Sequence, residues 1–187
     1  MRKFLFGTMT LLAFFPVSAA DPYVVDNTHS GVMFSVDHNN IATFFGRFNE
    51  FSGTMNYDEA NPASSKFDLT IQMESVDSAN ARRDKHLRSP DFFNTKQFPT
   101  ASFKTTGVTA NADGSLSVTG DFTLAGKTQP ITFAMKVRGP VNGRDGAKVR
   151  GFFATAVFKR SDFGITYGNP GVGDEVKITA SLEAVLK

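Results

Sequence analysis

The chain has 187 residues, including 20 phenylalanines but neither cysteine nor tryptophan. The lack of cysteine excludes disulfides, thiolate nucleophiles and zinc–thiolate sites. Lysine and arginine total 20 against 18 acidic residues, and two of the cations, Arg2 and Lys3, lie at the N-terminus. The remaining 18 cations balance the 18 anions. We therefore expect neither a nucleic-acid-binding surface nor a surface patch that binds acidic lipids.

The N-terminal segment has the features of a cleaved signal peptide. Arg2 and Lys3 precede an apolar run over Phe4–Phe15, and small residues end the segment at Ala19 and Ala20. Cleavage after either alanine fits the pattern, so we expect a signal peptide over residues 1–20 and export to the periplasm. Neither this run nor any later one reaches the roughly 18 apolar residues of a membrane-spanning helix. Residues 21–187 contain no linker-like segment and are expected to form one domain.

Apolar and polar residues alternate along several short segments, which is typical of strands with one buried face. Turn-forming residues at 111–114 and 125–128 separate some of these segments, and their glycines can adopt the positive φ of tight hairpins. The pattern predicts an all-β fold of seven or eight antiparallel strands around one interior, as a barrel or a sandwich. The clearest alternating segments are residues 32–37, 66–74, 115–124, 131–138 and 175–186.

One strand carries apolar residues on both faces. In the segment Phe152–Phe158, the set beginning with Phe152 is wholly apolar, whereas the set beginning with Phe153 is mixed. We therefore expect the first set to point inward, including the small Ala154 and Ala156. These alanines either leave space in the interior or face a bulky side chain from across the barrel.

The stretch "RRDKHLRSPDFF", Arg82–Phe93, interrupts the alternation. It predicts a short helix over Arg82–Leu87 with Ser78 or Asn80 as its N-cap. A second helical piece is expected to start at Pro90, because proline is favoured at the first position of a helix. Asp84 and Arg88 have the spacing of an ion pair on a helix. The apolar side chains of both pieces are expected to face the barrel, so that the segment forms a plug: Leu87, Phe92 and Phe93.

Several motifs in fixed order resemble the YceI-like family of exported, lipocalin-like proteins. These are "HSGVMFSVDH", "GRFNEFSG", "RRDKHLRSPDFF", "TGDFTLAGKTQPITF", "RSDFG" and "VGDEVKI". The resemblance covers essentially all of residues 21–187. It implies an all-β, eight-stranded antiparallel lipocalin-like barrel with a short helical plug at about residues 78–94. It also implies a long apolar pore, which in family members holds polyisoprenoids or similar long-chain amphiphiles.

The inward sets of the strands are the expected lining of this pore. An ordinary packed core would use the same positions, so the sequence alone leaves both readings open. The resemblance favours the pore. The expected lining consists of Val32, Phe34, Val36, Phe48, Met55, Phe67, Leu69, Ile71, Phe103, Phe122, Phe133, Met135, Phe152, Ala154, Ala156, Phe158, Ile178 and Leu182.

If the plug borders the mouth of the pore, the basic cluster Arg82, Arg83, Lys85 and Arg88 could meet a phosphate or another polar head group there. Arginine is suited to this role because it can bind phosphate through two hydrogen bonds. The alternative is that the basic residues form a solvated helix face balanced by Asp84 and Asp91. Candidate residues for the head group or the mouth are His38, Arg82, His86, Arg88, Phe92 and Phe93.

Neither catalysis nor metal binding is expected. The three histidines, His29, His38 and His86, lack the spacing of a metal-binding helix, and no motif of a hydrolase, nucleotide-binding protein or metalloprotease occurs. Ser30 follows His29, but adjacent residues of a strand point to opposite faces. We therefore predict no catalytic residues, no metal ligands and no cofactor.

The sequence supports two hypotheses about function. The first is a periplasmic carrier that holds a long-chain isoprenoid or isoprenoid quinone in its barrel. The second is a structural or stress-response barrel with a packed interior that binds a protein partner. Met33 and Phe153 are expected on the outer face, where they form a candidate homodimer surface.

Overall fold

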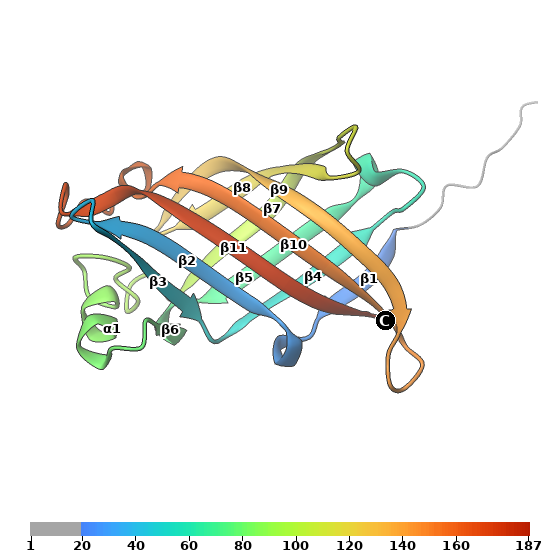
Figure 1. Cartoon of the computed structure of the whole chain (residues 1–187), viewed down its shortest axis with the longest axis horizontal. Coiled ribbons are helices and arrows are strands. Elements are labelled where there is room, and N and C mark those ends of the chain that lie inside the picture. Colours follow the sequence, from blue (N-terminus) through green and yellow to red (C-terminus); the bar gives the residue numbers. More distant parts are fainter. Residues whose placement is uncertain (1–19) are drawn as a thin grey trace, which may run out of the picture.

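The computed structural model describes residues 20–187, which form an elongated antiparallel β-barrel (Figure 1). Hydrogen-bonded neighbours run in the ring β1-β4-β5-β7-β8-β9-β10-β11 and back to β1, so eight strands close the wall and the expected fold is confirmed. The expected signal peptide lies outside the described residues except for Ala20. The elements are β1 (Asp21–Val25), β2 (Gly31–His38), β3 (Ala42–Phe48), β4 (Phe51–Tyr57), β5 (Lys66–Gln72), β6 (Val76–Asp77), α1 (Ala81–Leu87), β7 (Thr100–Ala110), β8 (Leu116–Leu124), β9 (Lys127–Asn142), β10 (Lys148–Lys159) and β11 (Val172–Leu186), with short 3₁₀ turns at Asn27–His29, Pro62–Ser64, Met73–Ser75 and Arg160–Phe163.

The alternating segments form the strands, with their apolar sets directed inward. On β10, Phe152, Ala154 and Ala156 are buried, whereas Phe153 and Val157 are exposed. The expected orientation of this strand is therefore confirmed. The wholly apolar set of side chains points inward because its burial removes more apolar area from water than burial of the mixed set would.

At two places in the barrel wall, two short strands follow one another along the barrel. These pairs are β1 with β2, and β3 with β4. A 3₁₀ turn separates β1 from β2, and the carboxylate of Asp26 caps it by accepting the backbone N–H of Thr28 at 2.9 Å. β2 pairs with β3, and β1 pairs with β4. β11 spans this turn, because residues 172–181 pair with β2 and residues 184–186 pair with β1. The β2–β3 hairpin can therefore diverge from the wall that β1 and β4 complete.

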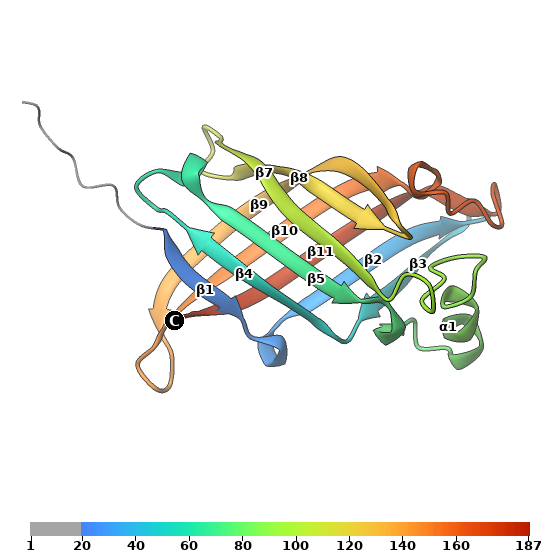
Figure 2. The same cartoon turned by 180° about the vertical axis from the view of Figure 1, so that it is seen from behind.

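β3 leaves the wall at the end of the barrel where β2 and β3 meet. Its partner on the side away from β2 is the short β6, which reaches Arg47 and Phe48 only. β5 pairs with β4 and β7, so β3 and β5 are not joined by hydrogen bonds. Figures 1 and 2 show α1 and the loop after it at this end of the molecule. The plug (residues 78–94) thus lies where the wall is interrupted.

The helix in the plug is capped by Asn80 rather than Ser78. The Asn80 side chain accepts a backbone N–H of the first turn at 3.0 Å. The hydroxyl of Ser78 instead donates to the carboxylate of Asp84. Asp84 is therefore buried against the start of its own helix, and the expected pair with Arg88 is wrong. The guanidinium of Arg88 lies 3.4 Å from the carboxylate of Glu74.

The second helical piece expected from Pro90 is also wrong. Residues 88–93 form turns, in which the N–H of Phe92 donates to the carbonyl of Ser89 at 3.1 Å and that of Phe93 to the carbonyl of Leu87 at 3.0 Å. The chain folds back to satisfy the free carbonyls at the end of α1 instead of starting a new helix. Leu87, Phe92 and Phe93 still pack against the barrel core, as expected. No helix within residues 20–187 has the length and apolar character to cross a membrane.

Side chains close the barrel at the end opposite α1. The buried ring of Phe152 lies 6.2 Å from that of Tyr23 and 5.8 Å from that of Phe67, measured between centroids. Beside these rings, the buried guanidinium of Arg150 donates to the Tyr23 hydroxyl at 3.2 Å and to the Glu59 carboxylate at 2.6 Å. A buried charge is tolerated when it is paired and hydrogen-bonded in this way. Side chains of the hydrophobic core thus pack across this end of the barrel.

Candidate ligand-binding cavity

A cavity of about 360 Å³ occupies the barrel interior at the end that carries α1. Side chains from β2 and β3 bound one side, those from β8, β10 and β11 bound the other, and the plug lies across the end. Of the 25 lining residues, 18 are apolar. A mostly apolar wall and a volume within roughly 300–1,000 Å³ are typical of small-molecule sites. The cavity is thus suited to a hydrocarbon chain.

The structure divides the expected pore lining into two groups. The members that border the cavity are Phe34, Val36, Phe48, Ile71, Phe122, Phe158 and Ile178. The members that lie in the packed core instead are Val32, Met55, Phe67, Leu69, Phe103, Phe133, Met135, Phe152, Ala154, Ala156 and Leu182.

The division has a physical cause. Alternation specifies which face of a strand points inward. It does not specify how far away the opposite wall lies, and therefore whether side chains from the two walls fill the interior. Ala156 pairs with Ile178 on β11, and large side chains fill the interior around it. At the other end, β3 diverges from β5, and the plug covers the interior without filling it. The cavity thus lies in the half of the barrel that carries the plug.

Aromatic rings form the inner part of the cavity wall. Phe122 and Phe158 lie 5.4 Å apart, and each lies within 5.4 Å of Phe163 from the turn after β10, measured between ring centroids. Phe34 and Phe48 approach Phe93 of the plug at 6.2 and 5.9 Å. These edge-on and tilted contacts are the favoured aromatic geometries, so they hold the wall in a defined shape.

Phe44 of β3 and Arg83 of α1 both border the cavity, and we take the place where they meet as its mouth. The guanidinium carbon of Arg83 lies 4.6 Å from the centroid of the Phe44 ring, and its Nε donates to the Ser78 hydroxyl at 2.7 Å. Arg83 belongs to the basic cluster expected near a head group, but it was not singled out from Arg82 and Arg88 as a residue of the mouth. Its position four residues before Leu87 is a signal that could have identified it, because residues with this spacing share one face of a helix.

A second group at the mouth surrounds His86. Its ring lies 5.0 Å from Phe92 and 4.9 Å from Tyr167 between centroids, and its Nε2 is 2.9 Å from a carboxylate oxygen of Asp91. Tyr167 comes from the loop between β10 and β11, so this cluster joins the plug to the opposite wall of the barrel.

The residues expected at the mouth do not all border the cavity. Four of them do: His38, His86, Phe92 and Phe93. Arg82 is exposed on the outer side of α1. Arg88 is directed to the backbone, where it donates to the carbonyls of Glu74 at 2.8 Å and Val76 at 2.9 Å. Arg88 therefore anchors the plug to the barrel.

Arg160 is a charged residue of the cavity wall that was also missed. Its guanidinium is 4% exposed and donates to four carbonyls, those of Ile165, Tyr167, Val172 and Gly173, at 2.7–2.9 Å. Burial lowers the pKa of Arg160 below its ordinary value, but an arginine remains protonated in proteins. It continues the inward set of β10 two residues after Phe158, which is a signal that could have identified it.

A separate group of ligand-type side chains lies away from the cavity. Three side chains each offer one potential ligand atom, and these atoms lie within 4.8 Å of one another: Asp26, His29 and Glu183. The Asp26 carboxylate accepts from His29 Nδ1 at 2.8 Å. This hydrogen bond raises the pKa of His29 above its ordinary value of 6.5 and lowers that of Asp26. The contact stabilises the 3₁₀ turn between β1 and β2.

Known proteins with similar sequences cover most of the chain. The protein named YceI from Escherichia coli O157:H7 is 40% identical, over 99% of this chain and 98% of its own length. A UPF0312 protein from Pseudomonas paraeruginosa is 41% identical, over 89% of this chain and 87% of its own length.

Solved structures share the barrel. BcnA from Burkholderia cenocepacia superposes with a TM-score of 0.77 at 27% identity, covering 85% of this chain and 98% of BcnA. A polyisoprenoid binding domain from Saccharophagus degradans superposes with a TM-score of 0.69 at 16% identity, covering 88% and 98%. The YceI-like domain model matches residues 23–184. This chain therefore belongs to the YceI-like family.

Proposed function

We propose that this protein is a periplasmic carrier of a long-chain isoprenoid amphiphile, with the hydrocarbon tail in the cavity and the head group at the mouth. The observation that carries the proposal is the composition of the cavity, in which 18 of 25 lining residues are apolar and the polar ones include Arg83 and His86 at the mouth. An apolar interior with a polar entrance matches an amphiphile in both parts.

The hydrophobic effect supplies the affinity. Each methylene equivalent that leaves water contributes about 0.8 kcal/mol. Ordering of the tail, loss of translational freedom and desolvation of the head group offset much of this gain. Phenylalanine suits the wall because it offers a large apolar area with only two rotatable bonds, so that little side-chain entropy is lost on binding.

The packed half of the barrel limits how much of the tail can be enclosed. Phe67 and Phe152 occupy the axis beyond the cavity. A long tail must therefore fold back within the cavity or leave through the mouth between β3 and α1. We expect the enclosed part to be a few isoprene units, whatever the total length of the lipid.

The comparisons are consistent with this proposal. The chain belongs to the YceI-like family, and the Saccharophagus degradans domain with the same fold is described as binding a polyisoprenoid. A role in binding rather than in catalysis agrees with both. The choice between an isoprenoid quinone and a polyprenyl phosphate depends on the head group.

Solvent extraction of the purified protein, followed by mass spectrometry, tests the proposal. We expect an isoprenoid lipid in stoichiometric amount when the protein is purified from the periplasm. A clean extract from several expression conditions would favour the alternative, a structural or stress-response barrel that binds a protein partner.

The homodimer remains a separate prediction. Met33 on β2 and Phe153 on β10 are both exposed on the outer wall. Size-exclusion chromatography with light scattering would show a dimer, and Phe153→Ser should shift it towards the monomer if this surface forms the contact.

A further inference from the structure

We propose that the barrel docks on an anionic lipid bilayer through the end that carries the cavity mouth, with the tip of the β2–β3 hairpin inserted among the lipids. The inference deepens the proposed function, on which it rests, because a carrier of a bilayer lipid must bring its cavity to the bilayer. The docking surface consists of Ile41, Phe45, Tyr167, Arg82 and Lys85 and is called the mouth surface below.

The apolar part of the mouth surface is unusually exposed. Ile41 is 84% exposed at the tip of the hairpin, where its N–H closes the turn by donating to the carbonyl of His38 at 3.1 Å. Phe45 is 70% exposed on β3, and Tyr167 is 49% exposed on the facing loop. Large side chains left in water in this way mark interaction sites. Phe45 and Tyr167 also border the cavity, so the apolar surface is continuous with the apolar interior.

The charged part of the mouth surface favours an anionic partner. Arg82 and Lys85 are exposed and lie three residues apart on α1, so they share one face of the helix. Neither has a carboxylate partner at ion-pair distance within residues 20–187. Asp91, the exposed acid nearby in sequence, is held by His86 at 2.9 Å. The cations and anions of residues 21–187 balance, but the exposed face of α1 is locally basic.

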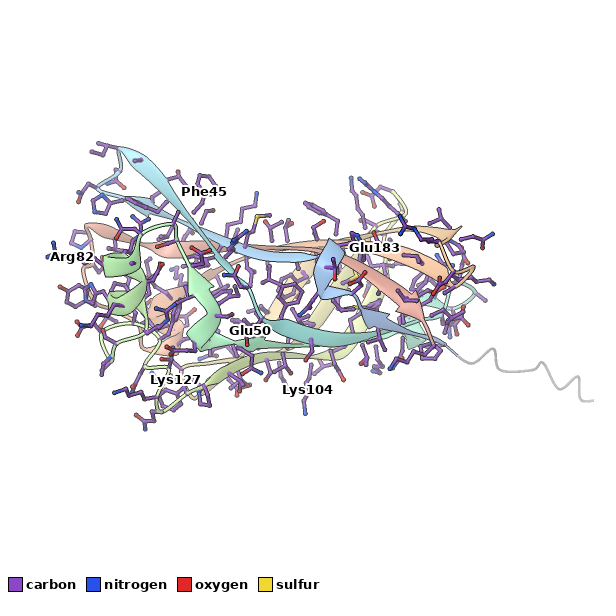
Figure 3. All side chains as sticks on the ribbon, turned by 90° about the horizontal axis from the view of Figure 1, so that it is seen from below. Phe45, Glu50, Arg82, Lys104, Lys127 and Glu183 are labelled. Carbon is purple, nitrogen blue, oxygen red and sulfur yellow. The ribbon has the colours of Figure 1, made fainter. Side chains whose placement is uncertain are left out.

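These groups lie together at one end of the barrel. Figure 3 shows Arg82 and Phe45 at the same end of the molecule, with Glu183 in the other half. Apolar and aromatic tips beside cations are the arrangement that binds the interface of an anionic membrane. A polar protein partner would not match the apolar tip, whereas a bilayer matches both parts.

The arrangement also explains how cargo could move. Phe44 and Arg83 meet at the mouth between β3 and α1, next to the side chains that we place in the bilayer. Insertion of Ile41 and Phe45 would bring this mouth to the level of the head groups. A lipid could then pass from the bilayer to the cavity without crossing water.

Sedimentation with vesicles tests the docking. The purified protein should sediment with vesicles of phosphatidylethanolamine and phosphatidylglycerol, and much less with phosphatidylcholine alone. Ile41→Ser should weaken partitioning by about tenfold, which is the order expected for loss of one buried apolar side chain. Arg82→Gln and Lys85→Gln should each weaken it by about fivefold on the anionic vesicles only.

Val141→Ser is the matched control. Val141 is an exposed aliphatic residue near the β9–β10 turn, at the other end of the barrel, and its replacement should leave sedimentation unchanged. Absence of sedimentation of the unaltered protein, or equal losses for Ile41→Ser and Val141→Ser, would overturn the docking. So would a dimer that Ile41→Ser dissolves without any vesicle binding, since the surface would then serve a second copy of this chain. Bound lipid is measured separately by extraction, so docking and cargo can fail independently.

Discussion

Arg83 of α1 lies over the ring of Phe44 of β3, with 4.6 Å between the guanidinium carbon and the ring centroid. On this side, the first residue of β3 that pairs with another strand within residues 20–187 is Arg47. The contact therefore connects the plug to the diverging hairpin at the place where the cavity opens. Arg88 and the packing of Phe93 also hold the plug to the barrel, as does the contact of His86 with Tyr167.

Removal of this contact should speed the release of a bound lipid. A cation–π contact at an exposed site contributes about 0.5–1 kcal/mol, so Arg83→Ala should raise the dissociation rate about twofold to fivefold. Stopped-flow displacement of a fluorescent isoprenoid by excess unlabelled lipid measures this rate. Arg82→Ala, which removes the neighbouring exposed arginine, is the control. Equal rates for the two variants would show that Arg83 does not restrain the mouth.

Filling the cavity should exclude the lipid without unfolding the protein. Val36 borders the cavity opposite the packed end and pairs with Val176, another lining residue. Val36→Phe should weaken lipid binding by about 5- to 100-fold, because a ligand and the new ring compete for one volume at a cost of roughly 1–3 kcal/mol. Lipid titration and thermal unfolding measure the two effects. Unchanged lipid content in a folded Val36→Phe protein would place the lipid elsewhere.

The same change at Ala156 should act differently. Ala156 is buried in the packed core and does not border the cavity. Ala156→Phe should therefore destabilise the protein by about 1–3 kcal/mol, because the surrounding side chains must move. Urea unfolding measures this loss. A stable variant with reduced lipid content would mean that the cavity extends further along the barrel than the packing shows.

Arg160 should be essential for the stability of the loop between β10 and β11. Its guanidinium donates to four backbone carbonyls of this loop and of the start of β11. Arg160→Leu should cost about 3 kcal/mol or more, since each buried acceptor left unpaired costs about 1–3 kcal/mol. Arg160→Lys should recover only part of the stability, because an ammonium cannot reproduce the planar set of donors. Urea unfolding of both variants gives the comparison, and full stability of the lysine variant would contradict this role.

His29 should titrate above its ordinary pKa of 6.5, because Asp26 accepts a hydrogen bond from it. A raised pKa in the folded state means that the contact stabilises the protein fully below pH 6.5, and that this contribution is lost as the pH rises through the raised pKa. The effect on stability is small because His29 is exposed. An NMR titration of His29 should show a lower pKa in Asp26→Asn than in the unaltered protein. The same pKa in both would mean that Asp26 does not act on the histidine.

The inward and outward faces of the barrel strands could be predicted from the sequence alone. Alternation along β5, β8, β9, β10 and β11 predicts which side chains point inward, because a strand has a fixed period of two. The turn between β8 and β9 followed from its residues, and Ala125 and Gly126 adopt positive φ there. The sequence offered two candidates for the N-cap of α1, Ser78 and Asn80, because both side chains can accept a backbone N–H.

The extent of the cavity could not be predicted in this way. Phe67 and Phe158 occupy equivalent positions in the sequence pattern, yet Phe67 is packed against Phe152 and Phe158 borders the cavity. The difference depends on how far β3 diverges from β5, which is a property of pairing between strands distant in sequence. Arg83 borders the cavity, whereas Arg82 and Arg88 do not. The composition of α1 does not distinguish these cations, and only the spacing of Arg83 from Leu87 indicates the face that it shares.

Photo-crosslinking with a diazirine-bearing isoprenoid tests the central claim most directly. We expect the label, identified by peptide mass spectrometry, on Phe34, Phe48 and Ile178, which border the cavity. Label on Phe67 or Phe152 at the packed end, or label confined to the outer wall and not reduced by unlabelled lipid, would contradict a lipid site beneath the plug.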